Sequence, residues 1–255
     1  MDKLSPIGVF DSGVGGVSVL RDMTRLLPRE RFIYYGDCKN APYGTKDEET
    51  IRALALAAAD RLLELDIKAL VIACNTATSA AAQALRDKLT IHVVGMEPAL
   101  KPASQLWHGG RILVLATPAT LRQRKFQRLN ELYGEHAEIC PCAGLMEFVE
   151  ADDTGSDALI SYLEDALRPW LSRQLDAVVL GCTHYVFLKE AIARVVPGVP
   201  LIDGNDGTAR RLKSLLEADG MTADSGQGGV TFMTSGDPDR MLPLMRRLLL
   251  TPAGA

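Results

Sequence analysis

Two cysteines stand in matching surroundings, each after a run of aliphatic residues and before two polar ones. Cys74 follows residues 69–73, and Cys182 follows residues 177–181. An aliphatic run bounded by polar turn residues predicts a parallel strand that is covered on both faces. Because ligands of parallel sheets bind outside the carboxyl ends of the strands, we expect the two thiols to face one another across one crevice.

Two thiols in that arrangement are suited to proton transfer. A thiolate is both a base and a nucleophile, and a cysteine beside a helix amino terminus has a pKa below its usual value of about 8.5. A single-nucleophile site could be assembled from Cys182 with His184 or Asp11 as its base. Two equivalent thiols favour a symmetric reaction, in which one thiolate removes a proton from a tetrahedral carbon and the opposite thiol returns one to the other face. The pattern therefore predicts racemisation by two bases.

An amino acid fits this chemistry, because it is small and its Cα proton lies next to a carboxylate. Negative charge that develops at Cα must be stabilised by preorganised hydrogen-bond donors. Asp11 and His184 are placed to orient a thiol or to exchange protons with it. The available donors are the amides of the glycine loop at residues 13–16 and the side chains of Ser12, Asn75, Thr76 and Thr183.

The glycine loop admits a second interpretation. Asp11 and Ser12 follow the apolar run at residues 7–10, and the glycines after them lead into a predicted helix whose free amides favour an anionic group. The spacing half matches a dinucleotide fingerprint, with Asp37 near the place of a ribose-binding acid. Ser18 stands where the third glycine belongs, however, and a nucleotide does not explain an acid and a hydroxyl directly at the end of the strand.

Three further polar segments each allow a structural and a functional interpretation. Tyr43 and Gly44 lie in a loop that reads as a turn, but the tyrosine also offers a hydroxyl. Thr117 and Thr120 are spaced to reach one carboxylate together, although Thr117 is equally a good helix cap. Simple surface charge is the ordinary explanation of two acidic residues, Glu147 and Glu150.

Strands alternate with helices along the chain. The predicted strands are residues 7–10, 32–35, 69–73, 91–94, 111–116, 137–140, 177–181 and 230–233. The predicted helices are residues 17–27, a helix capped by Thr45 or Asp47 that runs to 65, and residues 77–88, 121–133, 157–172 with a break near 168–169, 209–218 and 238–249. This alternation predicts parallel sheets with helices on both faces. The repeated cysteine pattern predicts two similar α/β halves that meet at a cleft. The boundary between the halves is expected at residues 95–98.

The composition is that of a globular enzyme. Hydrophobic residues make up 47% and charged residues 24% of the chain, and the formal net charge is -4, so nothing favours a nucleic-acid or membrane partner. The start of the chain lacks the pattern of an export signal, and the expected location is the cytoplasm. The five cysteines are expected to be thiols. Cys140 and Cys142 are spaced wrongly for a zinc knuckle, and we expect no metal.

Taken together, these segments resemble the glutamate racemases of the aspartate/glutamate racemase superfamily. The resemblance spans nearly the whole chain and is carried by Asp11-Ser12-Gly13-x-Gly15-Gly16, Pro42-Tyr43-Gly44, Cys74-Asn75-Thr76, Thr117-x-x-Thr120 and Gly181-Cys182-Thr183-His184-Tyr185. It implies two parallel-sheet α/β domains related by pseudo-twofold symmetry, with the active site in the cleft between them. It also implies that the C-terminal segment returns to the first domain, which gives one domain of residues 1–97 plus 209–255 and one of residues 98–208.

The resemblance further implies an enzyme that interconverts L- and D-glutamate without a cofactor and supplies D-glutamate for peptidoglycan. On the family pattern, Cys74 acts on D-glutamate and Cys182 on L-glutamate, Asp11 and His184 assist the thiols, and Glu150 lies near the second thiol. The implied assembly is a homodimer whose partner is the small-molecule substrate. The implied substrate contacts are Asp11, Ser12, Tyr43, Gly44, Asn75, Thr76, Thr117, Thr120, Thr183 and His184.

Several alternatives stay open at the level of sequence. An aspartate or broad-specificity racemase would share both thiols and differ in the reach to the side-chain carboxylate. A decarboxylase or isomerase of the same superfamily is a second alternative, but such a decarboxylase needs one thiol only. A non-catalytic amino-acid-binding protein would keep the cleft without the thiols. Buried free cysteines are also common as small hydrophobic residues, yet a chance pair at two equivalent strand ends is hard to accept.

Overall fold

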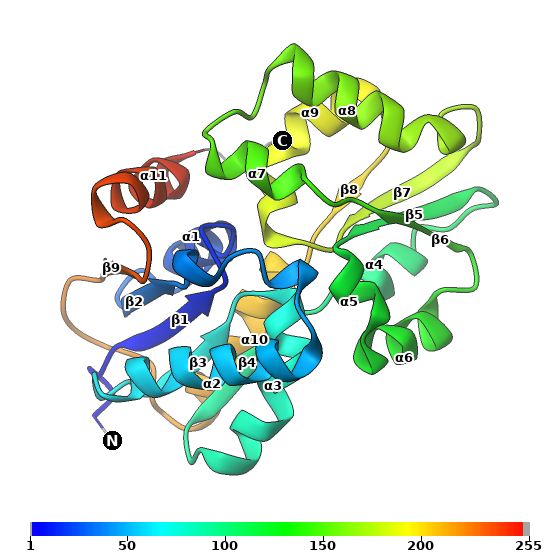
Figure 1. Ribbon diagram of the computed structural model, residues 1–255. Coiled ribbons are helices and arrows are strands. Elements are labelled where there is room, and N and C mark those ends of the chain that lie inside the picture. The colour runs from blue at the N-terminus through cyan, green and yellow to red at the C-terminus, as the bar shows by residue number, and fades with distance from the viewer. Residues whose placement is uncertain (1, 252–255) are drawn as a thin grey trace.

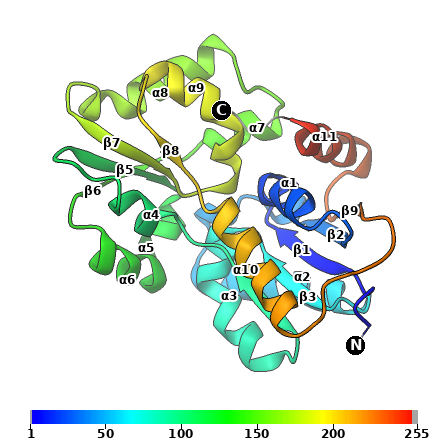
Figure 2. The same cartoon turned by 180° about the vertical axis from the view of Figure 1, so that it is seen from behind.

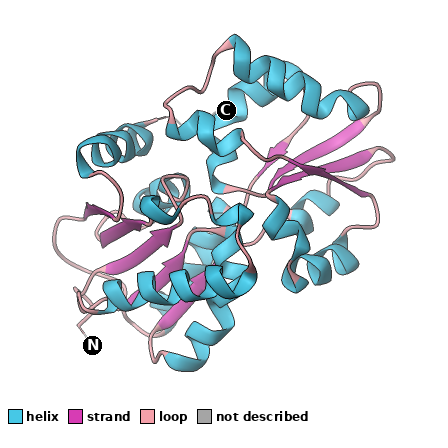
Figure 3. Cartoon of the chain, viewed as in Figure 1, coloured by secondary structure: helices cyan, strands magenta, loops and turns pink. Residues whose placement is uncertain are grey.

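The computed structural model describes residues 2–251 of the 255-residue chain and contains two separate parallel β-sheets with helices packed on them (Figure 1, Figure 3). The first sheet has the strand order β4-β3-β1-β2-β9, with bounds β1 (Ile7–Asp11), β2 (Arg31–Gly36), β3 (Ala69–Ile72), β4 (His92–Gly95) and β9 (Gly229–Thr234). The second sheet has the order β6-β5-β7-β8, with bounds β5 (Arg111–Ala116), β6 (Ala137–Pro141), β7 (Leu175–Leu180) and β8 (Leu201–Ile202). All strand pairs are parallel, and the predicted fold class is confirmed.

Helices connect the strands and cover the faces of both sheets. They are α1 (Val17–Leu26), α2 (Glu48–Leu63), α3 (Asn75–Lys88), α4 (Leu100–Ser104), α5 (Pro118–Arg122), α6 (Arg124–Tyr133), α7 (Leu145–Glu150), α8 (Asp157–Leu167), α9 (Lys189–Val195), α10 (Asn205–Ala218) and α11 (Pro238–Leu250). Within residues 2–251, none of them has the length and apolar character needed to cross a bilayer.

The two sheets share one strand order. The order β4-β3-β1-β2 of the first sheet matches β8-β7-β5-β6 of the second, and β9 is added at one edge of the first sheet. The strands that precede the two cysteines, β3 and β7, therefore occupy equivalent places beside β1 and β5. This equivalence explains why Cys74 and Cys182 leave their sheets in the same way.

Most elements follow the predicted runs, and side-chain caps explain where several helices begin. Asp47 caps α2 by accepting the backbone N–H of Thr50 at 2.8 Å, as one of the two predicted caps. α3 begins at Asn75, two residues before the predicted start, because the Cys74 side chain is its cap. The predicted helix at residues 121–133 is wrong in outline, since the extended backbone of Gln123 (ψ 139°) divides it into α5 and α6.

Four helices and strands lie outside the predictions, and all fall between residues 100 and 202. The helices α4, α7 and α9 have five to seven residues, and β8 has two. Such short segments carry too few residues for a periodic pattern to emerge from the sequence. One of them, α7, carries Glu150 at its end.

The C-terminal segment returns to the first sheet. β9 pairs with β2, and α11 packs on α1 (Figure 1). Seen from behind, α10 runs from the second sheet toward the first, and it packs on α1 and β4 (Figure 2). The domain boundaries expected from the sequence, residues 1–97 plus 209–255 and residues 98–208, stay a prediction.

A buried ion pair fastens the returning segment. Lys68 Nζ lies 2.6 Å from Glu30 Oε2, and the two side chains are 0% and 2% exposed. Lys68 also donates to the carbonyl oxygen of Met221 at 2.9 Å, and Glu30 Oε1 accepts the backbone N–H of Ala223 at 2.8 Å. Because every charge in this cluster has several partners, it joins β2, β3 and the chain before β9 at one point.

We predict that Lys68→Met lowers the free energy of unfolding by about 3–5 kcal/mol, because it leaves the buried Glu30 carboxylate without its cation. Urea unfolding measures the change. Lys88→Met is the matched control, since Lys88 pairs with Asp60 at 2.7 Å with both side chains 53% exposed, and such a pair contributes about 0–1 kcal/mol. Equal effects of the two substitutions would contradict the anchoring role of Lys68.

Candidate active site

Residues from both domains line one small cavity at the carboxyl ends of the central strands. Its volume is about 20 Å³, and it is lined by Ser12, Tyr43, Gly44, Cys74, Asn75, Thr76, Thr117, Met146, Gly181, Cys182, Thr183 and His184. The two thiols therefore share one enclosure, one from the end of β3 and one from the end of β7. Ten of the predicted site residues lie on its wall, and Asp11, Thr120 and Glu150 lie behind it.

Cys74 is held at the start of α3. Its Sγ accepts the backbone N–H of Ala77 at 3.4 Å and lies 3.5 Å from Ser12 Oγ. Burial raises the pKa of this thiol to about 12, and the nearby Asp11 carboxylate adds to the rise. The sequence-based expectation of a lowered pKa is thus wrong for Cys74 in this enclosed state, because one N–H and one hydroxyl offset only part of the cost of burying a thiolate.

Asp11 lies beneath Cys74 and connects the two domains. Its fully buried carboxylate accepts the Gly13 N–H at 2.8 Å, the Ser12 hydroxyl at 3.3 Å and the Thr183 hydroxyl at 3.0 Å. Burial raises the pKa of Asp11, while the charge of His184 and these three hydrogen bonds oppose the rise. Asp11 therefore forms a direct hydrogen bond from the first domain to the segment that carries the second thiol.

Cys182 lies two residues after the end of β7 and directly precedes a 3₁₀ helix, Thr183–Leu188. Its Sγ lies 3.7 Å from Nδ1 of the buried His184, whose Nε2 lies 3.5 Å from Glu150 Oε1. Burial lowers the pKa of His184, but Cys182, Glu150 and Asp11 together outweigh burial and raise it well above its usual value. The imidazolium is therefore stabilised between the second thiol and a carboxylate.

The glycine loop lets the two domains approach. A Cβ on Gly15 would lie 2.3 Å from His184 Nδ1 and 2.6 Å from Thr183 Oγ1, which no side chain tolerates. Tyr34 holds the loop from below, since its hydroxyl donates to the Gly13 carbonyl oxygen at 2.9 Å. The lack of a side chain at Gly15 thus allows the glycine loop to pack directly against Thr183 and His184.

Three threonine hydroxyls form a cluster across the domain boundary. Thr76 Oγ1 lies 2.9 Å from Thr120 Oγ1 and 3.3 Å from Thr117 Oγ1. Thr117 is also the cap of α5, which confirms one of the two sequence interpretations, and its contact with a carboxylate stays a prediction. Beside the cluster, Asn75 Oδ1 is buried without a hydrogen-bond partner among residues 2–251, which leaves an acceptor for a ligand N–H group.

The structure separates the two acidic residues of α7. Glu147 is exposed, whereas Glu150 is half-buried and directed at His184. Sequence reasoning missed Met146 and Gly181, which also line the cavity. Gly181 directly precedes Cys182, so the cysteine pattern could have identified it as a site residue. No sequence signal distinguishes Met146 from a core methionine. Gln123 was missed as well, and its side chain donates to the Thr76 carbonyl oxygen at 3.2 Å.

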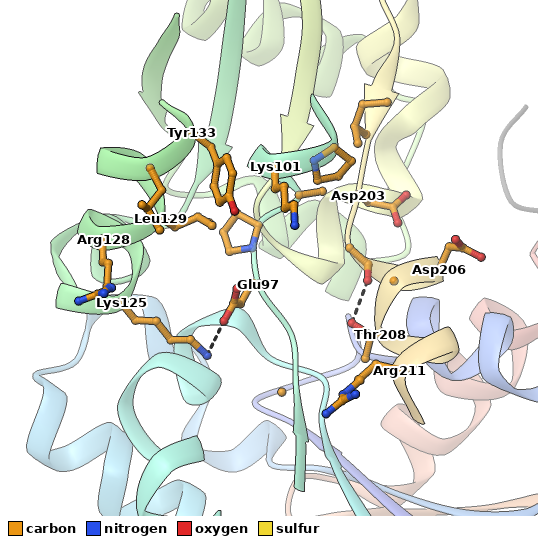
Figure 4. Close-up of a pocket in the computed structure, with 18 residues that line it drawn as sticks. Glu97, Lys101, Lys125, Arg128, Leu129, Tyr133, Asp203, Asp206, Thr208 and Arg211 are labelled. Carbon is orange, nitrogen blue, oxygen red and sulfur yellow. Dashed lines mark hydrogen bonds and ion pairs between the residues drawn. The ribbon is translucent and has the colours of Figure 1, made fainter. Parts of the chain in front are cut away.

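A second, larger cavity of about 780 Å³ lies on the side of α4, α6 and the start of α10 (Figure 4). Charged side chains line much of it, and Lys125 pairs with Glu97 at 2.7 Å. Neither cysteine of the strand ends reaches it. The smaller cavity is therefore the place where thiol chemistry is possible.

The fold and the site define a two-domain α/β protein that holds two thiols around one cavity. Comparisons with known proteins identify its family. Residues 7–212 match the family model described as Asp/Glu/Hydantoin racemase, and the chain belongs to this family. It is 46% identical over 252 residues to the glutamate racemase of Clostridium perfringens, covering 97% of both chains. The prediction of a racemase of this family is confirmed.

Solved structures agree with this assignment. The glutamate racemase of Thermus thermophilus, in complex with β-chloro-D-alanine, superposes with a TM-score of 0.82 at 38% identity over 97% of this chain and 94% of that one. The Escherichia coli glutamate racemase, in complex with L-glutamate and the activator UDP-MurNAc-Ala, superposes with a TM-score of 0.84 at 35% identity over 95% of each chain.

We predict that Glu150→Gln lowers the pKa of His184, because it removes one of the anionic groups that stabilise the imidazolium. The histidine ring signals, followed by NMR between about pH 6 and pH 9, report this value. Glu147→Gln is the matched control, since it removes a carboxylate from the exposed face of the same helix. If the pKa of His184 is equal in the two variants, the contact with Glu150 is not a cause of the raised pKa.

Proposed function

We propose that this chain interconverts L-glutamate and D-glutamate by two-base proton transfer at Cα. The observation that supports this most directly is that Cys74 and Cys182, from equivalent strand ends of two domains, line the same cavity. A proton acceptor and a proton donor on opposite sides of one carbon are what inversion requires. The identities to proteins named glutamate racemase support glutamate as the substrate.

The proposed reaction of L-glutamate begins at the second thiol. The Cys182 thiolate removes the Cα proton, and the Cys74 thiol then protonates the opposite face of the carbanion to give D-glutamate. In the reverse direction Cys74 is the base and Cys182 is the acid. His184 and Glu150 stand beside Cys182, and Asp11 lies near Cys74, so each thiol has its own partner for regaining or releasing a proton.

The remaining wall of the cavity is proposed to hold the substrate. The buried acceptor Asn75 Oδ1 suits the α-ammonium group, and the hydroxyls of Thr76, Thr117 and Thr120 suit a carboxylate. The rest of the predicted contacts, which are Asp11, Ser12, Tyr43, Gly44, Thr183 and His184, are proposed to surround the other groups of the substrate. Their donors to the second carboxylate would be backbone N–H groups, because the hydroxyl hydrogens of Ser12, Thr183 and Tyr43 are given to Asp11 and Asp37. The reaction needs no cofactor in this scheme, since thiols give and take the proton.

Binding of glutamate requires the two domains to separate. A cavity of about 20 Å³ is large enough for roughly one water molecule, whereas ligand pockets measure about 300–1,000 Å³. Several contacts that cross the boundary must break on opening, among them Thr183 to Asp11 and Gln123 to Thr76. The structure therefore corresponds to a closed state, in which Cys74 is buried and Cys182 is half-buried.

The proposed role is the supply of D-glutamate for peptidoglycan, with glutamate as the small-molecule partner. A homodimer and a cytoplasmic location belong to the same proposal. Both stay predictions.

We predict that the purified protein racemises L-glutamate without added pyridoxal phosphate or metal, and that aspartate is a poor substrate. Loss of circular dichroism of each amino acid measures the reaction.

Cys74→Ser and Cys182→Ser should each lower the rate by at least about 10²-fold, because a serine hydroxyl is a far weaker acid than a thiol. Cys38→Ser is the control, since Cys38 is a free thiol that does not line the cavity. Turnover of aspartate in place of glutamate would replace the substrate and keep the mechanism, whereas full activity in either site variant would end the two-base scheme.

A further inference from the structure

A buried carboxylate that the proposed reaction does not use lies behind the cavity wall. Asp37 is 3% exposed, and its Oδ2 accepts the hydroxyl of Tyr43 at 2.7 Å. Its Oδ1 accepts the hydroxyl of Ser235 at 2.6 Å, and Asn40 Nδ2 donates to both oxygens at 3.0 and 3.1 Å. Tyr43 is 1% exposed and lines the active-site cavity together with Gly44. The carboxylate thus links the cavity wall to a residue far along the chain.

Ser235 comes from the returning C-terminal segment, directly after β9. Its backbone N–H donates to the Gly36 carbonyl oxygen at 3.1 Å, which fixes the residue beside the end of β2. Its Oγ accepts the backbone N–H of Lys39 at 3.0 Å, so its own hydrogen is free to point at Asp37. The donor and acceptor capacities of the hydroxyl are therefore both used, and its direction is set.

We propose that Ser235 is a positioning residue that acts through Asp37 to hold Tyr43 and Gly44 against the substrate cavity. This inference rests on the proposed function. A charge-assisted hydrogen bond is short and directional, and Asp37 receives one from Ser235 and one from Tyr43. Loss of the Ser235 hydroxyl leaves Asp37 under-bonded, and Tyr43 then no longer has one fixed acceptor position.

The proposal also gives a reason for the addition of β9 to the first sheet. The shared four-strand order is complete without β9, which pairs only with β2 among residues 2–251. Its register places Thr234 opposite Gly36, and Ser235 follows at the carboxyl end of the sheet, where the other site residues lie. The fifth strand thus brings a side chain of the C-terminal segment to the carboxylate behind the active-site wall.

The test is a double-mutant cycle of Ser235→Ala and Tyr43→Phe, with KM and kcat for glutamate measured in both directions. A positioning role predicts that Ser235→Ala raises KM about tenfold and changes kcat by less than about twofold, because it loosens ground-state and transition-state contacts alike. Tyr43→Phe removes the other end of the same chain and should give the same KM-selective change. In the Tyr43→Phe background, Ser235→Ala should add almost nothing.

Two further variants separate positioning from general destabilisation. Ser235→Thr keeps the hydroxyl and should restore KM to near the wild-type value. Thr234→Val is the matched control, because Thr234 Oγ1 donates to the Gly36 carbonyl oxygen at 3.1 Å in the same turn and makes no hydrogen bond to Asp37. An unchanged KM in Ser235→Ala, or effects of Ser235→Ala and Tyr43→Phe that add in full, would overturn the inference. Wild-type protein that does not turn over glutamate would instead contradict the proposed function.

Discussion

The hydrogen bond from Thr183 to Asp11 joins the two domains at the point where the chemistry is expected. Asp11 is the last residue of β1, and Thr183 follows the cysteine after β7. Because the carboxylate is fully buried, it requires all of its donors, and Thr183 is the donor from the other domain. The same bond sets how closely Cys182 and His184 approach the glycine loop, where Gly15 leaves room for the imidazole.

Burial at this boundary favours the protonated form of Cys74. In the closed state the pKa of Cys74 is raised to about 12, so that this residue is a thiol at neutral pH. A thiol is the form needed to protonate a carbanion that was made by the opposite cysteine. For the reverse reaction Cys74 must lose its proton, and the positive α-ammonium group of a bound amino acid would favour the thiolate that burial alone disfavours. Domain closure and proton transfer are thus coupled through the same desolvation.

The sequence predicts the parts of this structure that depend on local pattern. The aliphatic runs identify the strands, and the repeated cysteine segments identify both thiols and their place at the strand ends. Contacts between distant segments are different, because nothing local records them. Glu150 reads as a surface charge until α7 brings it to His184, and Ser235 carries no signal until β9 pairs with β2. The raised pKa of Cys74 was also beyond prediction, since it depends on how completely the two domains exclude water.

The most direct test of the two-base account is the position of solvent deuterium early in the reaction. L-glutamate is incubated with the protein in D2O, and the two enantiomers are separated and analysed before about a tenth of the substrate has reacted. The account predicts deuterium at Cα of nearly all D-glutamate and almost none in the recovered L-glutamate, because the proton removed by one thiol is not the one delivered by the other. Equal labelling of both enantiomers would show that a single base serves both faces and would contradict the account.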